Sequence, residues 1–148
     1  MASTDFPLTA EESARWQNPD TIARLLETAH TIAIVGCSAD PAKDSHHVAA
    51  YLQNAGYRII PVAPRGGTIL GQTVQPSLAA IGEAVDLVDC FRPSAELGAI
   101  VAAAIAAKAR AIWFQLGLFD RAAALAAEAA GLTVIVDRCT KIEHAARR

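Results

Sequence analysis

The chain has 148 residues, a formal net charge of −2 at pH 7 and a hydrophobic fraction of 53%. No apolar run approaches the roughly 20 residues that a membrane-spanning helix needs, and no basic cluster offers a surface to nucleic acid, so neither partner is expected. Three cysteines without metal-ligand spacing argue against both a disulfide framework and a metal site. Because Met1 to Pro7 lack a basic segment followed by an apolar core, we expect no secretory signal and a cytoplasmic protein.

The first thirty residues predict two short helices. The stretch from Thr9 to Glu12 matches a capping box and predicts a helix that contains Trp16. Asn18 followed by Pro19 predicts the start of a second helix with an apolar stripe. We expect residues 1–30 to form a helical preface packed on the sheet of a single domain that spans residues 1–148.

The next segment predicts a strand, a helix and a second strand. Residues 31–35 form a β-branched apolar run that ends at Gly36, and residues 57–62 form the second strand. Between them Ser45 is expected to cap a helix that ends at Gly56. Such a unit is right-handed, and its glycine turn faces the positive end of a helix, a junction that suits phosphate.

The remaining chain continues the alternation. Strands are predicted at residues 85–91, 111–114 and 133–136, with shorter extended pieces at 68–70 and 73–74 and a helical turn after Pro76. Ser94 and Asp120 are expected to cap the intervening helices, and a terminal helix follows the last strand. The strands are nearly continuous apolar runs, which is typical of a parallel sheet covered on both faces. The sequence therefore predicts an α/β fold, a doubly wound parallel sheet of five or six strands of the Rossmann-like type.

In such a sheet a ligand lies at the carboxyl ends of the strands, where the strand order reverses. The loops at that edge cover residues 36–44, 63–67, 91–94, 115–118 and 137–141. A nicotinamide dinucleotide is disfavoured, because no G-x-G-x-x-G follows the first strand and no carboxylate ends the second. Arg65 follows the second strand instead and suits a phosphorylated ribose, while Lys43 supplements the helix amides. The alternative is that the glycine and proline residues in each loop serve only to turn the chain and bind no ligand.

Seven short motifs together carry a family resemblance. They are Gly36-Cys37-Ser38, Lys43-Asp44-Ser45, Gly56-Tyr57, Pro61-Val62-Ala63-Pro64, Phe91-Arg92, Trp113-Phe114-Gln115-Leu116-Gly117 and Asp137-Arg138-Cys139. In order and spacing, from about Thr31 to His144, they resemble the stand-alone CoA-binding domain proteins. Those proteins are similar to the amino-terminal CoA-binding module of the succinyl-CoA synthetase α subunit.

The resemblance implies coenzyme A, or an acyl-CoA, as the cofactor. It implies that Gly36 and Ser38 meet the pyrophosphate and that Lys43 and Ser45 support phosphate at the helix start. It also implies a border of Val62 and Pro64 around the adenine or its ribose, and a neighbouring wall of Phe91 and Arg92. The site then also includes Cys37 in the glycine loop and Arg65, which either contacts phosphate or stays solvated. The family usually has asparagine where this chain has Ala63, and the histidines at 46 and 47 also depart from its pattern.

A non-catalytic binding module is the expected function: a carrier, sensor or accessory protein without catalytic residues. An acyl-CoA ligase would need further domains for phosphoryl transfer. Two alternatives stay open, namely a small NADP-binding reductase-like protein with Arg65 on the 2′-phosphate, and a nucleotide-free interaction adaptor, suggested by Ala63. The acyl group, a protein partner and a homodimer also stay open.

The three cysteines Cys37, Cys90 and Cys139 all fall at the predicted ligand edge. Each could be a small buried hydrophobe. The sharper hypothesis is a reactive Cys37, because loop amides and a helix amino-terminus favour the thiolate. Arg92 could instead pair with Asp86 or Asp89 and fix its loop.

Overall fold

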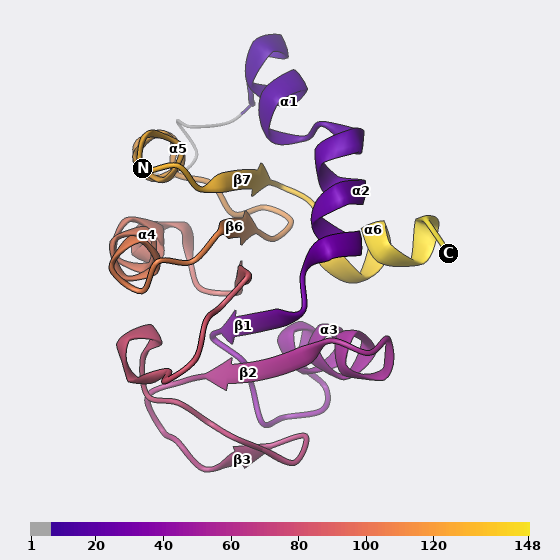
Figure 1. Cartoon of the computed structure of the whole chain (residues 1–148), viewed down its shortest axis with the longest axis vertical. Coiled ribbons are helices and arrows are strands. Elements are labelled where there is room, and N and C mark those ends of the chain that lie inside the picture. The colour runs from indigo at the N-terminus through magenta and orange to yellow at the C-terminus, as the bar shows by residue number, and fades with distance from the viewer. Residues whose placement is uncertain (1–6) are drawn as a thin grey trace.

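Five parallel strands form the central sheet of the computed structural model, which describes residues 7–148 (Figure 1). The strand order is β2-β1-β5-β6-β7. The bounds are Thr31–Val35 for β1, Arg58–Val62 for β2, Leu87–Cys90 for β5, Ala111–Phe114 for β6 and Thr133–Val136 for β7. The predicted doubly wound parallel sheet is confirmed, and its order reverses at β1, which has β2 on one side and β5 on the other.

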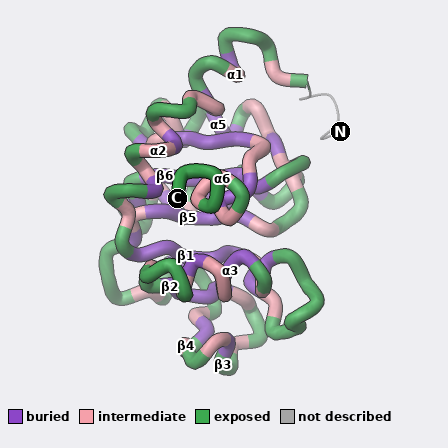
Figure 2. Tube along the Cα trace, turned by 90° about the vertical axis from the view of Figure 1, so that its right-hand side faces the viewer, coloured by how far each residue is buried: buried purple, intermediate pink, exposed green. Residues whose placement is uncertain are grey.

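Helices cover both faces of the sheet. They are α1 (Ala10–Trp16), α2 (Pro19–Thr28), α3 (Asp44–Asn54), α4 (Leu97–Ala106), α5 (Arg121–Ala129) and α6 (Thr140–Ala146). Figure 1 shows α4 and α5 on one face and α2, α3 and α6 on the other. Alternate residues of each strand enter two separate cores: on β6, Phe114 packs under α4 and α5 and Trp113 packs on the opposite side. Apart from Arg58 and Thr133 at the starts of β2 and β7, the residues of the five strands are buried, whereas the outer faces of the helices are exposed (Figure 2).

The amino-terminal helices have the caps that the sequence predicts. Thr9 Oγ1 accepts from the amide of Glu12 at 3.1 Å, and Glu12 Oε1 accepts from the amide of Thr9 at 2.9 Å. Trp16 is buried and its indole donates to Glu128 at 3.1 Å, which joins α1 to α5. Asn18 caps α2 through the amides of residues 20 and 21. The part of the predicted preface formed by residues 1–6 lies outside the described residues.

Two predicted helix caps are wrong. Helix α3 begins at Asp44, and its N-cap residue Lys43 makes no side-chain cap. Ser45 is buried instead and its Oγ accepts from the amide of Ser38 at 2.9 Å. Ser94 starts a 3-10 turn before α4, and its Oγ accepts from the amide of Phe119 at 3.0 Å. Each hydroxyl holds a neighbouring loop rather than its own helix, because tertiary packing brings a distant unpaired amide within reach.

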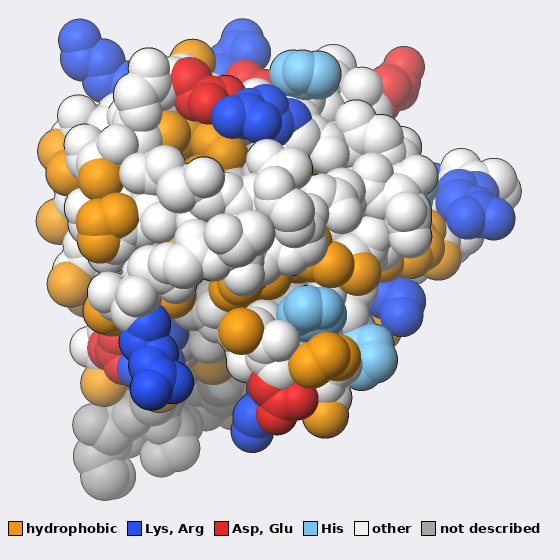
Figure 3. All heavy atoms as spheres, turned by 90° about the horizontal axis from the view of Figure 1, so that it is seen from below, with side chains coloured by type: hydrophobic (Ala, Val, Ile, Leu, Met, Phe, Trp, Pro, Cys, Tyr) orange, Lys and Arg blue, Asp and Glu red, His pale blue; other side chains and the backbone are white. Residues whose placement is uncertain are grey.

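A small hairpin lies beside the outer edge of β2. Its strands are β3 (Thr68–Ile69) and β4 (Gln72–Thr73), and a 3-10 turn follows at Leu78–Ala80. Gln75 bonds to the backbone of Pro61 and Ala63, so the segment after the hairpin covers the edge of β2. Viewed from this side, the surface shows charged side chains scattered around the rim and no basic patch (Figure 3). Within residues 7–148, no helix has both the length and the apolar character needed to cross a membrane.

Candidate functional site

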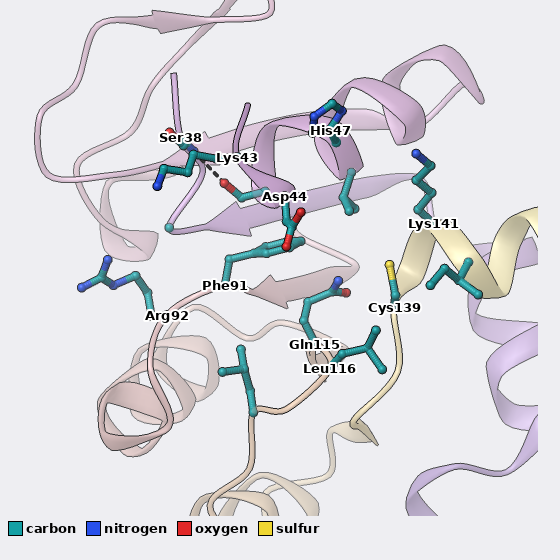
Figure 4. Close-up of a pocket in the computed structure, with 15 residues that line it drawn as sticks. Ser38, Lys43, Asp44, His47, Phe91, Arg92, Gln115, Leu116, Cys139 and Lys141 are labelled. Atoms are coloured by element: carbon teal, nitrogen blue, oxygen red, sulfur yellow. Dashed lines mark hydrogen bonds between the residues drawn. The ribbon is translucent and has the colours of Figure 1, made fainter. Parts of the chain in front are cut away.

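A groove of two adjoining cavities lies at the carboxyl ends of β1, β2 and β5, the predicted reversal point of the strand order. The cavities share Gly36, Ser38 and Arg92. The larger one, here called the large lobe, holds about 800 Å³ between the start of α3, residues 115–118 and residues 139–142 (Figure 4). The small lobe holds about 530 Å³ between residues 62–65, residues 76–78 and α4.

The residues predicted to bind a cofactor all line this groove. The large lobe has Gly36, Ser38, Lys43, Ser45, Phe91 and Arg92, and the small lobe adds Cys37, Val62, Pro64 and Arg65. The fold thus brings together loops that are up to 56 positions apart in the sequence, from Gly36 to Arg92. Their proximity follows from the parallel sheet, because the carboxyl ends of its strands meet at one edge.

Gly36 lies between the two lobes, at a position where the neighbouring loop leaves no room for a side chain. Its φ is 85°, a conformation that side chains with a Cβ rarely adopt. A Cβ at this position would lie 2.7 Å from Arg92 Cδ and 3.2 Å from the carbonyl oxygen of Phe91. The loop after β5 therefore packs directly against the backbone of the glycine turn, and the position requires glycine on both counts.

The amides expected to receive phosphate are only partly free. The amide of Gly36 donates to Val62 at 2.9 Å, and the amide of Ser38 donates to Ser45 Oγ. Among the described residues, the amides of Asp44 and Ser45 have no acceptor, as expected for the first turn of a helix. The amides of Cys37 and Ala39 likewise have no acceptor among the described residues, so free donors are found both in the glycine loop and at the start of α3.

The loop between Gly36 and α3 is held in place by its own side chains. His46 Nδ1 lies 2.9 Å from the carbonyl oxygen of Ser38, and Asp40 Oδ1 accepts from the amide of Ala42 at 2.9 Å. Lys43 is exposed, and no ion pair involves it within residues 7–148. An ordered loop with an unpaired lysine beside free helix amides can receive an anion with little rearrangement.

The guanidinium group of Arg92 is paired with one carboxylate, that of Glu96. It makes two bonds to Glu96, at 2.8 and 3.1 Å, and the pairing lowers the pKa of Glu96. The pairing with Asp86 or Asp89 that the sequence left open does not occur. Asp86 instead accepts from the amides of His30 and Thr31 at the opposite end of the sheet. Arg92 stays exposed at the junction of the lobes.

Beneath the large lobe lies a buried polar network that sequence reasoning did not find. Thr140 Oγ1 lies 2.9 Å from Asp89 Oδ2, and Gln115 Oε1 accepts from the amide of Thr140 at 3.1 Å. Burial raises the pKa of Asp89 to about 8, and Oδ1 of this carboxyl has no partner in the described part of the chain. The network ties the start of α6 to β5 and so fixes one wall of the lobe. The loops at 115–118 and 137–141 were predicted at this edge, but no local signal indicated this pairing.

The hypothesis of a reactive Cys37 is wrong. The side chain is 3% exposed, and burial, followed by the nearby Asp89 charge, raises the pKa of its thiol to about 11. Cys37 packs into the core beneath α3 instead of facing the loop amides, so the thiolate is disfavoured. Cys90 is fully buried, and its pKa is also raised by burial. Cys139 lines the large lobe, and Figure 4 shows its sulfur pointing into the cavity.

In the described residues, no group of three or more histidine, cysteine or acidic side chains is arranged to hold a metal ion. The groove offers a different set of groups: unpaired cations, free helix amides and apolar walls. This combination suits an organic ligand that carries phosphate.

The fold and the groove together define a doubly wound α/β protein with a groove at its topological switch point. A family model described as CoA binding domain matches residues 30–145, and the chain belongs to this family. It is 37% identical over 131 residues to the uncharacterized protein YneT of Bacillus subtilis, a match that covers 87% of this chain and 97% of that protein.

Solved structures show the same architecture. A hypothetical protein from Pyrococcus horikoshii superposes with a TM-score of 0.84 at 32% identity, covering 87% of this chain and 91% of that one. The dinucleotide forming acetyl-coenzyme A synthetase 1 of Ca. Korarchaeum cryptofilum superposes with a TM-score of 0.66 at 20% identity, covering 75% of this chain and 26% of that one. The latter similarity is one of fold. The predicted resemblance to CoA-binding domain proteins is confirmed by the family match.

Proposed function

We propose that the protein binds coenzyme A or an acyl-CoA in this groove as a non-catalytic carrier, sensor or accessory module. The observation that carries the proposal is the shape of the groove, two lobes that meet at Gly36 beside the start of α3. Coenzyme A has the matching outline: an adenosine, a diphosphate at the bend and a long pantetheine arm. The family match supports the same class of ligand.

The small lobe suits the adenosine. Val62 and the side chains of α4 provide apolar walls, and Pro64 borders the opening. Arg65 is exposed at this lobe and has no ion pair within residues 7–148, so it is available to the 3′-phosphate. Ala63 has no polar side chain to offer here, and its amide already donates to the carbonyl oxygen of Gln75 at 3.0 Å. Recognition of the nucleotide then depends on shape and on Arg65.

The junction suits the diphosphate. Lys43 and the free amides of Asp44 and Ser45 supply positive potential, and Arg92 lies on the opposite side. The large lobe then takes the pantetheine arm, which would run past Phe91 towards Cys139 (Figure 4).

The groups that face the groove support binding rather than catalysis. Across residues 7–148, no hydrogen bond joins a groove-lining nucleophile to a base, as nucleophilic catalysis requires. The carboxyl with the most perturbed pKa, Asp89, is fully buried and does not line either lobe. These features are expected of a carrier or sensor.

Titration calorimetry with CoA, dephospho-CoA and NADP tests the proposal. CoA should bind and NADP should not. Lys43→Ala should weaken CoA binding by about one to two decades, because it removes a charge-assisted contact, and should leave the fold intact. Binding of NADP without a response to CoA would favour the reductase-like alternative. Binding of neither nucleotide would favour the interaction adaptor.

A further inference from the structure

The large lobe has basic side chains at both ends. Figure 4 shows Lys43 and Arg92 near the junction of the lobes, and His47 and Lys141 towards the other end. If CoA lies as proposed above, the first pair serves its phosphates. The second pair then lies beyond the diphosphate, where the thiol end of the pantetheine arm and any attached acyl group would be.

Lys141 contacts an aromatic ring of α3. Its Nζ lies 5.8 Å from the ring centroid of Tyr51, a cation–π contact between α6 and α3. The Tyr51 hydroxyl lies 2.8 Å from His144 Nδ1, and the His144 ring packs edge-on against Tyr57 with centroids 5.7 Å apart. The lysine is half-buried, and its surroundings restrict where the ammonium group can lie.

No carboxylate in the described part of the chain lies within ion-pair distance of Lys141. Within the described residues, its ammonium group contacts the Tyr51 ring instead of a carboxylate. Asp44 is the one acidic residue among residues 7–148 that lines this lobe, and it follows directly on Lys43 at the start of α3. The end of the lobe near Lys141 therefore offers an ammonium group that no described carboxylate pairs with.

The walls around this end are apolar. Leu116 is 55% exposed and Ile142 is 56% exposed, and both line the large lobe. They offer hydrocarbon contacts to the methylene groups that would join a thioester to a terminal anion. A carboxylate is an anion that an ammonium group and a histidine N–H can bind through charge-assisted hydrogen bonds.

We infer that the large lobe selects acyl-CoA thioesters of short dicarboxylic acids, with Lys141 binding the free carboxylate and His47 as its second contact. This inference rests on the proposed function, because it takes the CoA orientation from it. It adds the class of acyl group, and it assigns a binding role to α6.

Two stable thioethers of CoA test the inference: S-(3-carboxypropyl)-CoA, which carries a terminal carboxylate, and S-butyl-CoA, which does not. The measured quantity is the ratio of their dissociation constants, obtained by calorimetry. The wild-type protein should prefer the carboxylate by about ten-fold or more. Lys141→Met should bring the ratio close to one, and Lys141→Arg should restore part of it. Lys43→Met is the matched control: it should weaken both ligands and keep the ratio.

Each other result is informative. Equal binding of the two thioethers by the wild type would overturn the acyl-group inference and leave CoA binding intact. A preference that survives in Lys141→Met would also overturn it, since the discrimination would then lie elsewhere. Failure of the wild type to bind CoA and both thioethers would overturn the proposed function itself, and the inference with it.

Discussion

The close packing at Gly36 allows a quantitative prediction for Gly36→Ala. The alanine would have to adopt the φ of 85° that Gly36 has, and this left-handed conformation costs a residue with a Cβ about 1–2 kcal/mol. Its Cβ would also lie 2.7 Å from Arg92 Cδ and 3.2 Å from the Phe91 carbonyl oxygen. The arginine stem can move, but the backbone oxygen belongs to the loop that leaves β5. Overpacking of this kind costs about 1–3 kcal/mol, so the free energy of unfolding should fall by about 2–5 kcal/mol in total.

Gly71→Ala is the matched control. Gly71 has a φ of 77°, and nothing lies within 4 Å of its would-be Cβ. This variant should lose only the backbone part, about 1–2 kcal/mol. The gain from a less flexible unfolded chain is the same for both glycine-to-alanine changes and cancels in their difference.

Urea denaturation of both variants measures the two free energies. CoA titration should in addition show weaker binding for Gly36→Ala, because Arg92 and the glycine turn border both lobes. Equal destabilisation of the two variants, together with unchanged CoA affinity for Gly36→Ala, would refute the argument that a close approach at Gly36 shapes the groove.

Three further predictions concern single side chains. Arg65→Ala should reduce the preference for CoA over dephospho-CoA by about ten-fold or more, and an unchanged preference would leave Arg65 as a solvated cation. With iodoacetamide at pH 7.5, Cys139 should react before Cys37, because burial raises the pKa of the Cys37 thiol to about 11. CoA should protect Cys139 from the reagent. Peptide mass spectrometry that finds Cys37 modified first would contradict the structure. Burial raises the pKa of Asp89 from 3.8 to about 8. Between about pH 4 and pH 8 the folded state therefore keeps a proton that the unfolded chain releases. The free energy of unfolding should fall as the pH rises through this range. Asp89→Asn should flatten that slope in urea titrations, and parallel profiles would show that Asp89 is ionised in the folded protein.

Much of the fold follows from local patterns in the sequence. The apolar runs at residues 31–35, 111–114 and 133–136 are strands, and the caps at Thr9, Asn18 and Asp120 start helices where predicted. These features depend on neighbouring residues alone, since a cap serves amides two or three positions away. The location of the groove also follows, because the parallel order of strands brings their carboxyl ends to one edge whatever the loops contain.

Tertiary packing decided the chemistry of individual side chains. Ser45 and Ser94 bond to loops brought near them by the fold, and Cys37 turns into a core that removes its thiol from water. The contacts that position Lys141 and Asp89 join residues far apart in the sequence: Tyr51 and His144 are 93 positions apart, and Asp89 and Thr140 are 51 apart. No local pattern encodes such partners, because burial and hydrogen bonding depend on which distant segments the folded chain places side by side. The residues at the edge of the sheet could therefore be predicted from the sequence, whereas their pKa values and their pairing could be known only from the folded structure.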